Sequence, residues 1–307
     1  MNWVIKAVSG KLLSYLPFHL NIYWYLQKNV IKTVTLTESM IKRHIERGLE
    51  SISELVKIKK AADLLKAYYY DLGTGSYIII PLVRYCIGIN KQHLTDIRRN
   101  LDARIQRSSV EKMQGYLDYI NEHNPLGTTI RNIPSFKNDQ KLDEYLKKVG
   151  MLYDSPFDSR RTAFQNKSID IISCTSVLQY PTHENLEKIL CECYRILKND
   201  GLFFIQVDLC DEFYKPDGNI SIYNYLKYSD FVWNKIISSR LLSHNRYRTN
   251  DFKDLFKKAG FKIIFEKITP PTKKEFDELQ KLKLNSKYRG MDLQDLGIKD
   301  MVVILGK

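Results

Sequence analysis

The feature that most constrains the fold is a series of short apolar runs, separated by helix-like segments, between residues 67 and 210. The runs are rich in β-branched and aromatic residues and lack strict alternation, a pattern typical of strands buried on both faces. Because strands that alternate with helices form βαβ units, the sequence predicts an α/β fold with a parallel sheet. We predict its strands at 67–72, 92–97, 150–155, 169–174 and 201–209.

A helix is predicted between the last two of these strands. Thr182 is its expected cap, and apolar residues recur at helical spacing from Leu186 to Leu197. Gly201 follows at the exit, near the point where a left-handed residue would end the helix. The segment therefore completes a strand–helix–strand unit.

The same alternation returns near the C-terminus. Thr249 is the expected cap of a short helix, and Gly260 is expected to end it. Strands are predicted at 261–268 and at 301–307. These two strands would complete the sheet at the end of the chain.

Residues 1–66 are predicted to form a helical, basic extension. A helix is expected to begin near Thr37 and to carry an apolar stripe from Ile41 to Val56. Residues 1–33 contain no acidic residue, and large apolar side chains are interleaved with their lysines: Lys6, Lys11, Lys28 and Lys32, with Trp3, Leu12, Leu13, Leu16, Phe18, Tyr23, Trp24 and Leu26. Such a segment either covers a neighbouring site as a lid or lies on an anionic membrane surface.

The cysteine content indicates the cellular location that we expect. The five cysteines are odd in number and form no CxxC pair or zinc-like cluster, so we expect reduced thiols, no metal site and a cytoplasmic protein.

The longest apolar run, Tyr77–Ile89, is shorter than the roughly 20 residues of a membrane-spanning helix. We expect no signal peptide in the first 20 residues. The net charge of +13 is consistent with an anionic partner or with a lysine-rich proteome.

One glycine-rich segment has the features of a ligand-binding loop. Asp71-Leu72-Gly73-Thr74-Gly75 ends a predicted strand and precedes a helix. Gly73 and Gly75 permit a tight turn and allow a ligand to approach the backbone. Asp96 comes 21 residues after Gly75, at the end of the next predicted strand. An acid at that place accepts hydrogen bonds from ribose hydroxyls in nucleotide-binding folds, or else caps a helix.

Four ordered segments resemble motifs of the class I S-adenosylmethionine-dependent methyltransferases, in the branch that acts on small molecules. They are Asp71–Gly75, Asn166–Ser173, Ser176–Tyr180 and Tyr194–Gly201. The resemblance covers about 67–210 and implies a Rossmann-like, doubly wound, mostly parallel seven-stranded sheet with an antiparallel last strand. The chain departs from the family pattern in having Tyr77 where a third glycine is common.

The resemblance also implies where the cofactor, S-adenosylmethionine, would bind. The backbone of Gly73, Thr74 and Gly75 would hold its amino-acid tail, with Asp71 near the amino group. Asp96 would bind the ribose, and Ser176 would line the methionine end of the pocket. Asp158 would meet the adenine amino group, and Phe157 or Ile97 would flank the ring.

The methyl acceptor is expected to be a small molecule or a saccharide- or lipid-linked intermediate. Residues 67–307 would form the methyltransferase domain, with an acceptor-side insertion at about 211–248. If the acceptor is a hydroxyl, a base is needed, and Asp208 and Asp211 are the candidates after the fifth predicted strand. Glu212, His183 and Tyr180 are further candidates.

Three other functions are alternatives to methyl transfer to a small molecule. A dehydrogenase would need a third glycine at position 78, which is Ile. The positive charge is compatible with an RNA methyltransferase, but the sequence has no Asn-Pro-Pro-Tyr or Pro-Cys signature, so nucleic acid is not the expected acceptor. A non-catalytic, membrane-associated protein with the same fold is the remaining alternative.

Overall fold

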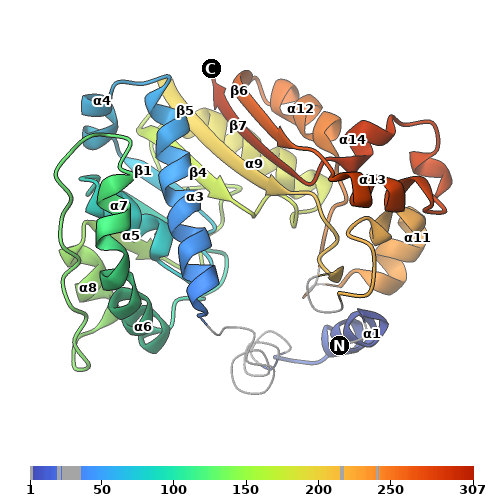
Figure 1. Ribbon diagram of the computed structural model, residues 1–307, viewed down its shortest axis with the longest axis horizontal. Coiled ribbons are helices and arrows are strands. Elements are labelled where there is room, and N and C mark those ends of the chain that lie inside the picture. Colours follow the sequence, from blue (N-terminus) through green and yellow to red (C-terminus); the bar gives the residue numbers. More distant parts are fainter. Residues whose placement is uncertain (1–2, 19–21, 23–35, 215–217, 240, 242) are drawn as a thin grey trace.

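The computed structural model describes residues 3–18, 22, 36–214, 218–239, 241 and 243–307. Within this part of the chain, seven strands form one sheet in the order β3-β2-β1-β4-β5-β7-β6 (Figure 1). The strands are β1 (Tyr69–Leu72), β2 (Gln92–Thr95), β3 (Met151–Asp154), β4 (Ile169–Thr175), β5 (Leu197–Asp208), β6 (Lys262–Thr269) and β7 (Asp300–Gly306). Each overlaps a predicted strand.

The direction of the strands agrees with the sequence-based prediction. β1 pairs in parallel with β2 and β4, and β2–β3 and β4–β5 are also parallel. β7 is antiparallel to both β5 and β6. The predicted Rossmann-like, mostly parallel sheet with an antiparallel last strand is confirmed.

Helices cover both faces of the sheet (Figure 1). On one face α3 (Glu38–Val56) and α5 (Ile79–Cys86) pack over β1, and on the other lie α9 (His183–Ile196) and α12 (Thr249–Lys258). The other helices are α1 (Trp3–Leu13), α4 (Ala61–Lys66), α6 (Ala103–Met113), α7 (Leu117–Glu122), α8 (Leu142–Lys148), α11 (Asp230–Val232), α13 (Lys273–Gln280) and α14 (Leu293–Gly297). Short 3-10 turns lie at Gln114–Tyr116, Asn224–Lys227 and Ser286–Tyr288, and η4 (Trp233–Ile237) is a π-helical turn.

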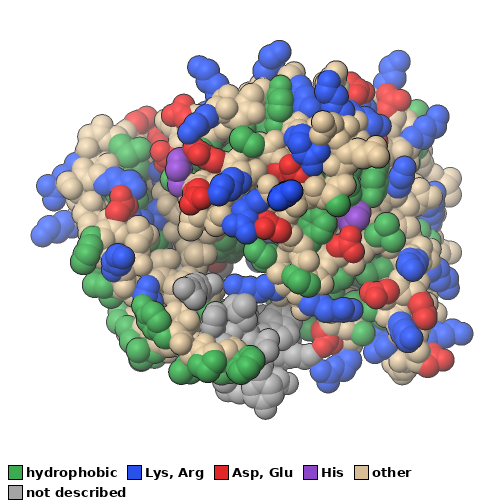
Figure 2. Space-filling view, turned by 180° about the vertical axis from the view of Figure 1, so that it is seen from behind, with side chains coloured by type: hydrophobic (Ala, Val, Ile, Leu, Met, Phe, Trp, Pro, Cys, Tyr) green, Lys and Arg blue, Asp and Glu red, His purple; other side chains and the backbone are tan. Residues whose placement is uncertain are grey.

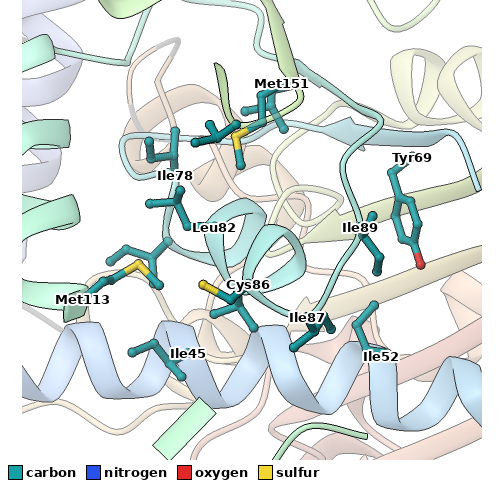
Figure 3. Close-up of a cluster of buried hydrophobic side chains, with 14 of the residues drawn as sticks. Ile45, Ile52, Tyr69, Ile78, Leu82, Cys86, Ile87, Ile89, Met113 and Met151 are labelled. Atoms are coloured by element: carbon teal, nitrogen blue, oxygen red, sulfur yellow. The ribbon is translucent and has the colours of Figure 1, made fainter. Parts of the chain in front are cut away.

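The helix predicted near Thr37 is confirmed and belongs to the core of the sheet. The Thr37 side chain caps α3 by accepting a hydrogen bond from the Met40 amide. Ile45 and Ile52 of α3 are fully buried in the cluster that contains α5 and the β1 residue Tyr69 (Figure 3). Residues 38–66 therefore share a core with the sheet, and the domain boundary that we place after residue 66 stays a prediction.

Successive side chains of β1 point to opposite faces of the sheet and pack into two different hydrophobic clusters. Tyr69 lies in the cluster beneath α3 and α5, whereas Tyr70 and Leu72 lie in the cluster beneath α9 and α12. Burial on both faces explains why the predicted strands lack an alternating polar pattern. The five cysteines are free thiols, and three of them, Cys86, Cys174 and Cys193, are buried.

Two details of the predicted helix ends are wrong. Gly201 does not end α9 in a left-handed conformation, because the helix ends at Ile196 and Gly201 lies inside β5. A Cβ at Gly201 would lie 2.9 Å from the Asp170 carbonyl oxygen, which explains the glycine. Thr249 is the first residue of α12 instead of its cap; Arg248 occupies the cap position. Gly260 does follow α12 with a φ of +95°, as predicted.

The N-terminal segment lies against a third cluster. α1 packs on η4, and its Trp3 ring contacts Phe213 and Tyr228. The predicted residues Tyr23, Trp24, Leu26, Lys28 and Lys32 lie outside the described residues. In the described part of the chain, no helix is long and apolar enough to span a bilayer.

Replacing Ile52 with Ala should destabilise the whole domain, because α3 and the sheet share one core. We expect a loss of about 2–5 kcal/mol in the free energy of unfolding. Urea unfolding followed by circular dichroism measures it, with the half-exposed Ile58→Ala as the matched control. Loss of α3 in a separate early transition, with the sheet unfolding as in the wild type, would contradict a shared core.

Candidate cofactor and acceptor site

The loop after β1 lies at the carboxyl edge of the sheet, between β2 and β4. The amides of Gly73 and Thr74 donate hydrogen bonds to the Thr95 carbonyl oxygen, at 3.0 and 2.9 Å. Gly73 and Gly75 have φ angles of +77° and +75°, a region that favours glycine. A Cβ at Gly73 would lie 2.5 Å from Val177, whereas one at Gly75 would have no atom within 4 Å. Gly75 therefore leaves open space beside the backbone.

Asp71 lies beneath this loop and is buried. Its Oδ1 accepts a hydrogen bond from Ser173 Oγ at 2.5 Å, and its Oδ2 accepts one from Thr74 Oγ1 at 3.3 Å. The guanidinium of Arg84, which is also buried, lies 3.5 Å from Oδ1 and donates to Ser173 Oγ at 2.7 Å. The carboxylate of Asp71 is thus balanced by a cation from α5.

Arg84 was not predicted as a site residue. The available signal was a single basic residue inside the apolar run Tyr77–Ile89. A buried arginine is stable only beside an anion, so a search for its partner points to an acid at the edge of the sheet. Nε and Nη1 of Arg84 have no hydrogen-bond partner within the described residues.

Asp96 holds the same loop from the β2 side. Its Oδ2 accepts a hydrogen bond from the Gly75 amide at 2.9 Å, and its Oδ1 accepts one from the Arg98 amide at 3.1 Å. The structure therefore brings Asp71 and Asp96 to the same glycine-rich loop. Ile97, directly after Asp96, is 66% exposed.

Phe157 and Asp158 lie next to Asp96 but have partners of their own. The Phe157 amide donates to the Asp96 carbonyl oxygen at 2.9 Å, and its ring packs against Tyr70, 6.2 Å between centroids. Asp158 accepts hydrogen bonds from Arg160, and these hold the pKa of the carboxyl below its usual range. Asp158 therefore faces Arg160 in this structure.

The segment after β4 closes the other side of the loop. Ser176 adopts a φ of +56°, and its amide donates to the Gln206 carbonyl oxygen at 2.8 Å. Val177, next in the chain, is the residue that approaches Gly73. Tyr77, which stands where a third glycine is common, has its ring 5.7 Å from His44 of α3.

Part of the chain is similar to a known protein family. Residues 137–205 match a family model described as a methyltransferase domain. The matched range contains β3, β4, α9 and the first part of β5. The matched range includes three of the four segments that resemble motifs of the class I S-adenosylmethionine-dependent methyltransferases: Asn166–Ser173, Ser176–Tyr180 and Tyr194–Gly201.

Solved structures with a similar chain path include two S-adenosylmethionine-dependent methyltransferases. The one from Methanosarcina mazei is 13% identical, with 78% of this chain and 92% of that chain covered and a TM-score of 0.43. The one from Mesorhizobium loti is 14% identical, with 78% and 91% covered and a TM-score of 0.40. No sequence among the curated proteins matches this chain.

The residues at the loop fit the cofactor of this methyltransferase family. The open space beside Gly75 admits a ligand against the main chain. A carboxylate has about four acceptor positions, so Asp96 can still accept ribose hydroxyls after it has bound the two amides. The exposed Ile97 side chain offers an apolar surface to an adenine ring.

Two predicted catalytic carboxylates follow β5, and the structure places them differently. Asp208 is half-buried at the carboxyl end of β5, opposite Asp300 of β7. Burial raises the pKa of Asp300 to about 6, with Asp208 adding to the rise. Asp300 was not predicted, because its position depends on an antiparallel β7 whose first residue meets the end of β5.

Asp211 has no exposed surface. Its Oδ1 accepts a hydrogen bond from the Phe213 amide at 2.7 Å, and its Oδ2 accepts one from Asn224 at 3.3 Å. Burial raises its pKa to about 6. Contact with an acceptor would require movement of the surrounding residues.

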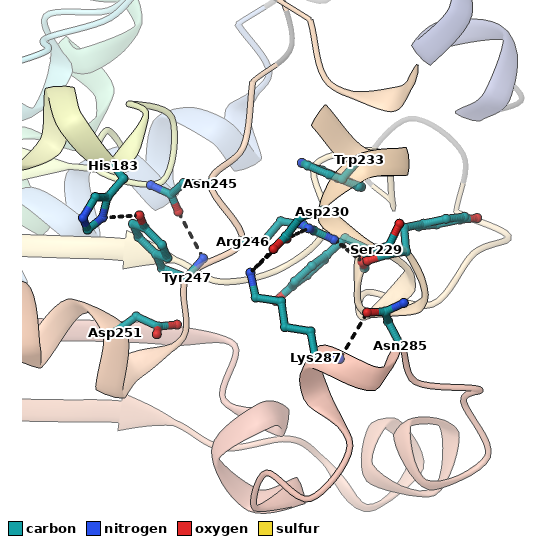
Figure 4. A network of polar contacts seen from close by, with 12 residues as sticks. His183, Ser229, Asp230, Trp233, Asn245, Arg246, Tyr247, Asp251, Asn285 and Lys287 are labelled. Atoms are coloured by element: carbon teal, nitrogen blue, oxygen red, sulfur yellow. Dashed lines mark hydrogen bonds and ion pairs between the residues drawn. The ribbon is translucent and has the colours of Figure 1, made fainter. Parts of the chain in front are cut away.

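The predicted acceptor-side residues form a polar network with the C-terminal segments (Figure 4). Arg246 is buried and binds Asp230, which also pairs with Lys287 at 2.9 Å. His183 and Tyr247 are hydrogen-bonded at 2.6 Å and line a cavity of about 220 Å³ between α9 and α12. That cavity borders the helices on the opposite face of the sheet from Asp71 and Arg84.

Replacing Arg84 with Met should destabilise the protein by about 3–5 kcal/mol, because it leaves the Asp71 carboxylate buried without a counter-charge. The double variant Arg84→Met/Asp71→Asn should recover at least about 1 kcal/mol relative to the sum of the single variants. Urea unfolding of all four proteins measures this coupling. Strictly additive losses would show that the two side chains do not stabilise one another.

Replacing Asp211 with Asn should stabilise the protein at neutral pH. The folded-state pKa of about 6 lies above the usual 3.8, so the cost of ionisation is absent below pH 3.8 and complete above pH 6. Asn removes that cost, about 3 kcal/mol at most. Its amide can donate to Asn224 Oδ1 once the Asn224 side-chain amide turns over, since Nδ2 now faces position 211 and Oδ1 has no partner among the described residues.

The advantage of Asp211→Asn over the wild type should therefore grow as the pH rises from about 5 to about 7.5. Urea unfolding at the two pH values measures it. The exposed Asp143→Asn serves as the matched control and should show no such growth. A variant that is less stable than the wild type at neutral pH would contradict this assignment.

Proposed function

We propose that this methyltransferase binds S-adenosylmethionine over residues 73–75 and transfers the methyl group to a small molecule or to a saccharide- or lipid-linked intermediate. The observation that carries the proposal is the open space at Gly75 directly beside the Asp96 carboxylate. When bound, S-adenosylmethionine supplies a methyl group on a positively charged sulfur. The residues of the chain bind and orient the cofactor and the methyl acceptor.

The loop residues bind and orient the cofactor in this proposal. The backbone of Gly73, Thr74 and Gly75 holds the amino-acid tail. Asp71 contributes negative potential near the amino group, which Arg84 moderates from below. Asp96 accepts the ribose hydroxyls and keeps the loop in place through the Gly75 amide.

The adenine end is proposed to lie over Ile97, with Phe157 behind it. Asp158 is the proposed acceptor for the adenine amino group, and it would have to exchange a hydrogen bond with Arg160 for one with the ligand. Ser176 is proposed to border the methionine end, since it follows β4 and Val177 touches Gly73.

The acceptor is proposed to enter from the side of residues 208–248. Asp208 is the stronger candidate for a base toward a hydroxyl acceptor, because it is only half-buried at the end of β5. Asp211 would act only after Phe213 and Asn224, which bind its carboxylate, had moved. The free thiols are compatible with a cytoplasmic location, which we also propose.

The cofactor proposal is tested by titration calorimetry with S-adenosylmethionine. We expect wild-type binding, and a drop in affinity of about tenfold to a hundredfold for Asp96→Ala, which removes a charge-assisted hydrogen-bond acceptor. Gly75→Val should abolish binding, because its side chain occupies the open space and strains the backbone.

The control is Asp143→Ala, which removes an exposed carboxylate from α8. Its affinity should equal that of the wild type. If the folded wild type does not bind S-adenosylmethionine, the chain is a non-catalytic protein with this fold. If Asp96→Ala binds as the wild type does, the cofactor lies elsewhere.

A further inference from the structure

α1 exposes large aliphatic side chains to solvent, unlike an ordinary amphipathic helix on a protein surface. Its two buried residues, Ala7 and Gly10, are small. Ile5 and Leu12 point outward and are 63% and 65% exposed, and Val4 and Val8 are nearly half exposed. A surface helix normally buries its large aliphatic side chains against the protein. These aliphatic side chains therefore form an exposed apolar face on α1.

The apolar surface extends beyond the helix. Leu16 and Phe18 continue it along the chain, and Phe231 and Ile236 add to it from α11 and η4, the latter in contact with α1. We call this surface the apolar edge: Ile5, Leu12, Leu16, Phe18, Phe231 and Ile236. Figure 2 shows hydrophobic side chains gathered along the lower left edge of the molecule. Large apolar side chains exposed on neighbouring segments are typical of interaction sites.

α1 is held firmly in this orientation. The Trp3 ring lies 5.8 Å from that of Phe213, and Lys6 Nζ lies 5.9 Å above the same ring. Lys11 Nζ donates hydrogen bonds to the carbonyl oxygens of Ser238 and Asn234, at 2.7 and 3.3 Å. These contacts hold the face that carries Trp3, Lys6 and Lys11 against the protein, so the exposure of the aliphatic face follows from the packing.

The charge around the apolar edge favours anionic lipid. Residues 1–37 contain no acidic residue, and Lys227 and Lys235, which are near Phe231 and Ile236 in the sequence, are exposed. Asp230, the neighbouring acid, is paired with Arg246 and Lys287. A second copy of this chain, with the same net charge of +13, would be repelled, whereas anionic headgroups would be attracted.

We propose that the apolar edge docks the protein on an anionic membrane surface, with α1 lying in the plane of the interface. The apolar side chains enter the boundary between headgroups and acyl chains, and nearby lysines meet the headgroups. This inference concerns membrane attachment and does not depend on methyl transfer.

Vesicle co-sedimentation of the full chain tests the proposal. The probes are phosphatidylcholine vesicles with and without phosphatidylglycerol. We expect binding that requires phosphatidylglycerol and weakens as salt is raised. The variant Ile5→Glu/Leu12→Glu should bind at least about tenfold more weakly, because two exposed aliphatic side chains become charged.

The matched control is Ile268→Glu, which changes an exposed aliphatic residue on β6, and it should bind vesicles as the wild type does. Circular dichroism establishes that each variant is folded. Absence of wild-type binding, or equal binding by the double variant, would overturn the proposal. So would a wild-type dimer that the double variant abolishes while neither protein binds vesicles, since a second copy would then cover the edge.

Discussion

The site depends on how the loop after β1 is tied to the end of β2. Two amides of the loop share the Thr95 carbonyl oxygen, and the third, from Gly75, is held by the Asp96 side chain. These bonds satisfy backbone donors that would otherwise be unpaired at the edge of the sheet. They also set the open space at Gly75 beside a carboxylate. The parallel register of β1 and β2, which aligns Leu72 with Thr95, makes this arrangement possible at all.

Beneath the loop, a buried charge pair connects the sheet to α5. Asp71 and Arg84 are both removed from water, and Ser173 of β4 bonds to each of them. Burial of an ion pair gives little net stability, but it penalises any packing that separates the partners. The pair therefore sets the position of α5, against which α3 packs, relative to the strand that carries the glycine-rich loop.

Much of this architecture was predictable because burial on both faces leaves a clear pattern in the strands. The seven strands, the cap at Thr37 and the end of α12 at Gly260 follow from local chemistry. The predicted helix end at Gly201 is wrong because the sequence does not distinguish a glycine that ends a helix from one that is required by a close contact with a carbonyl oxygen. Asp300 was missed because its position depends on pairing between the distant strands β5 and β7. Arg84 was missed because its contact with Asp71 arises only when α5 packs on the sheet. The exposed aliphatic face of α1 could not be foreseen, since its composition suits burial equally well.

Hydrogen–deuterium exchange with and without S-adenosylmethionine tests the central claim, that the ligand rests on this loop, most directly. The account predicts slower exchange in peptides that cover 72–76 and 95–98, because the ligand would further restrain amides already bonded to Thr95 and Asp96. Unchanged exchange there, with protection instead at the cavity between α9 and α12, would contradict it.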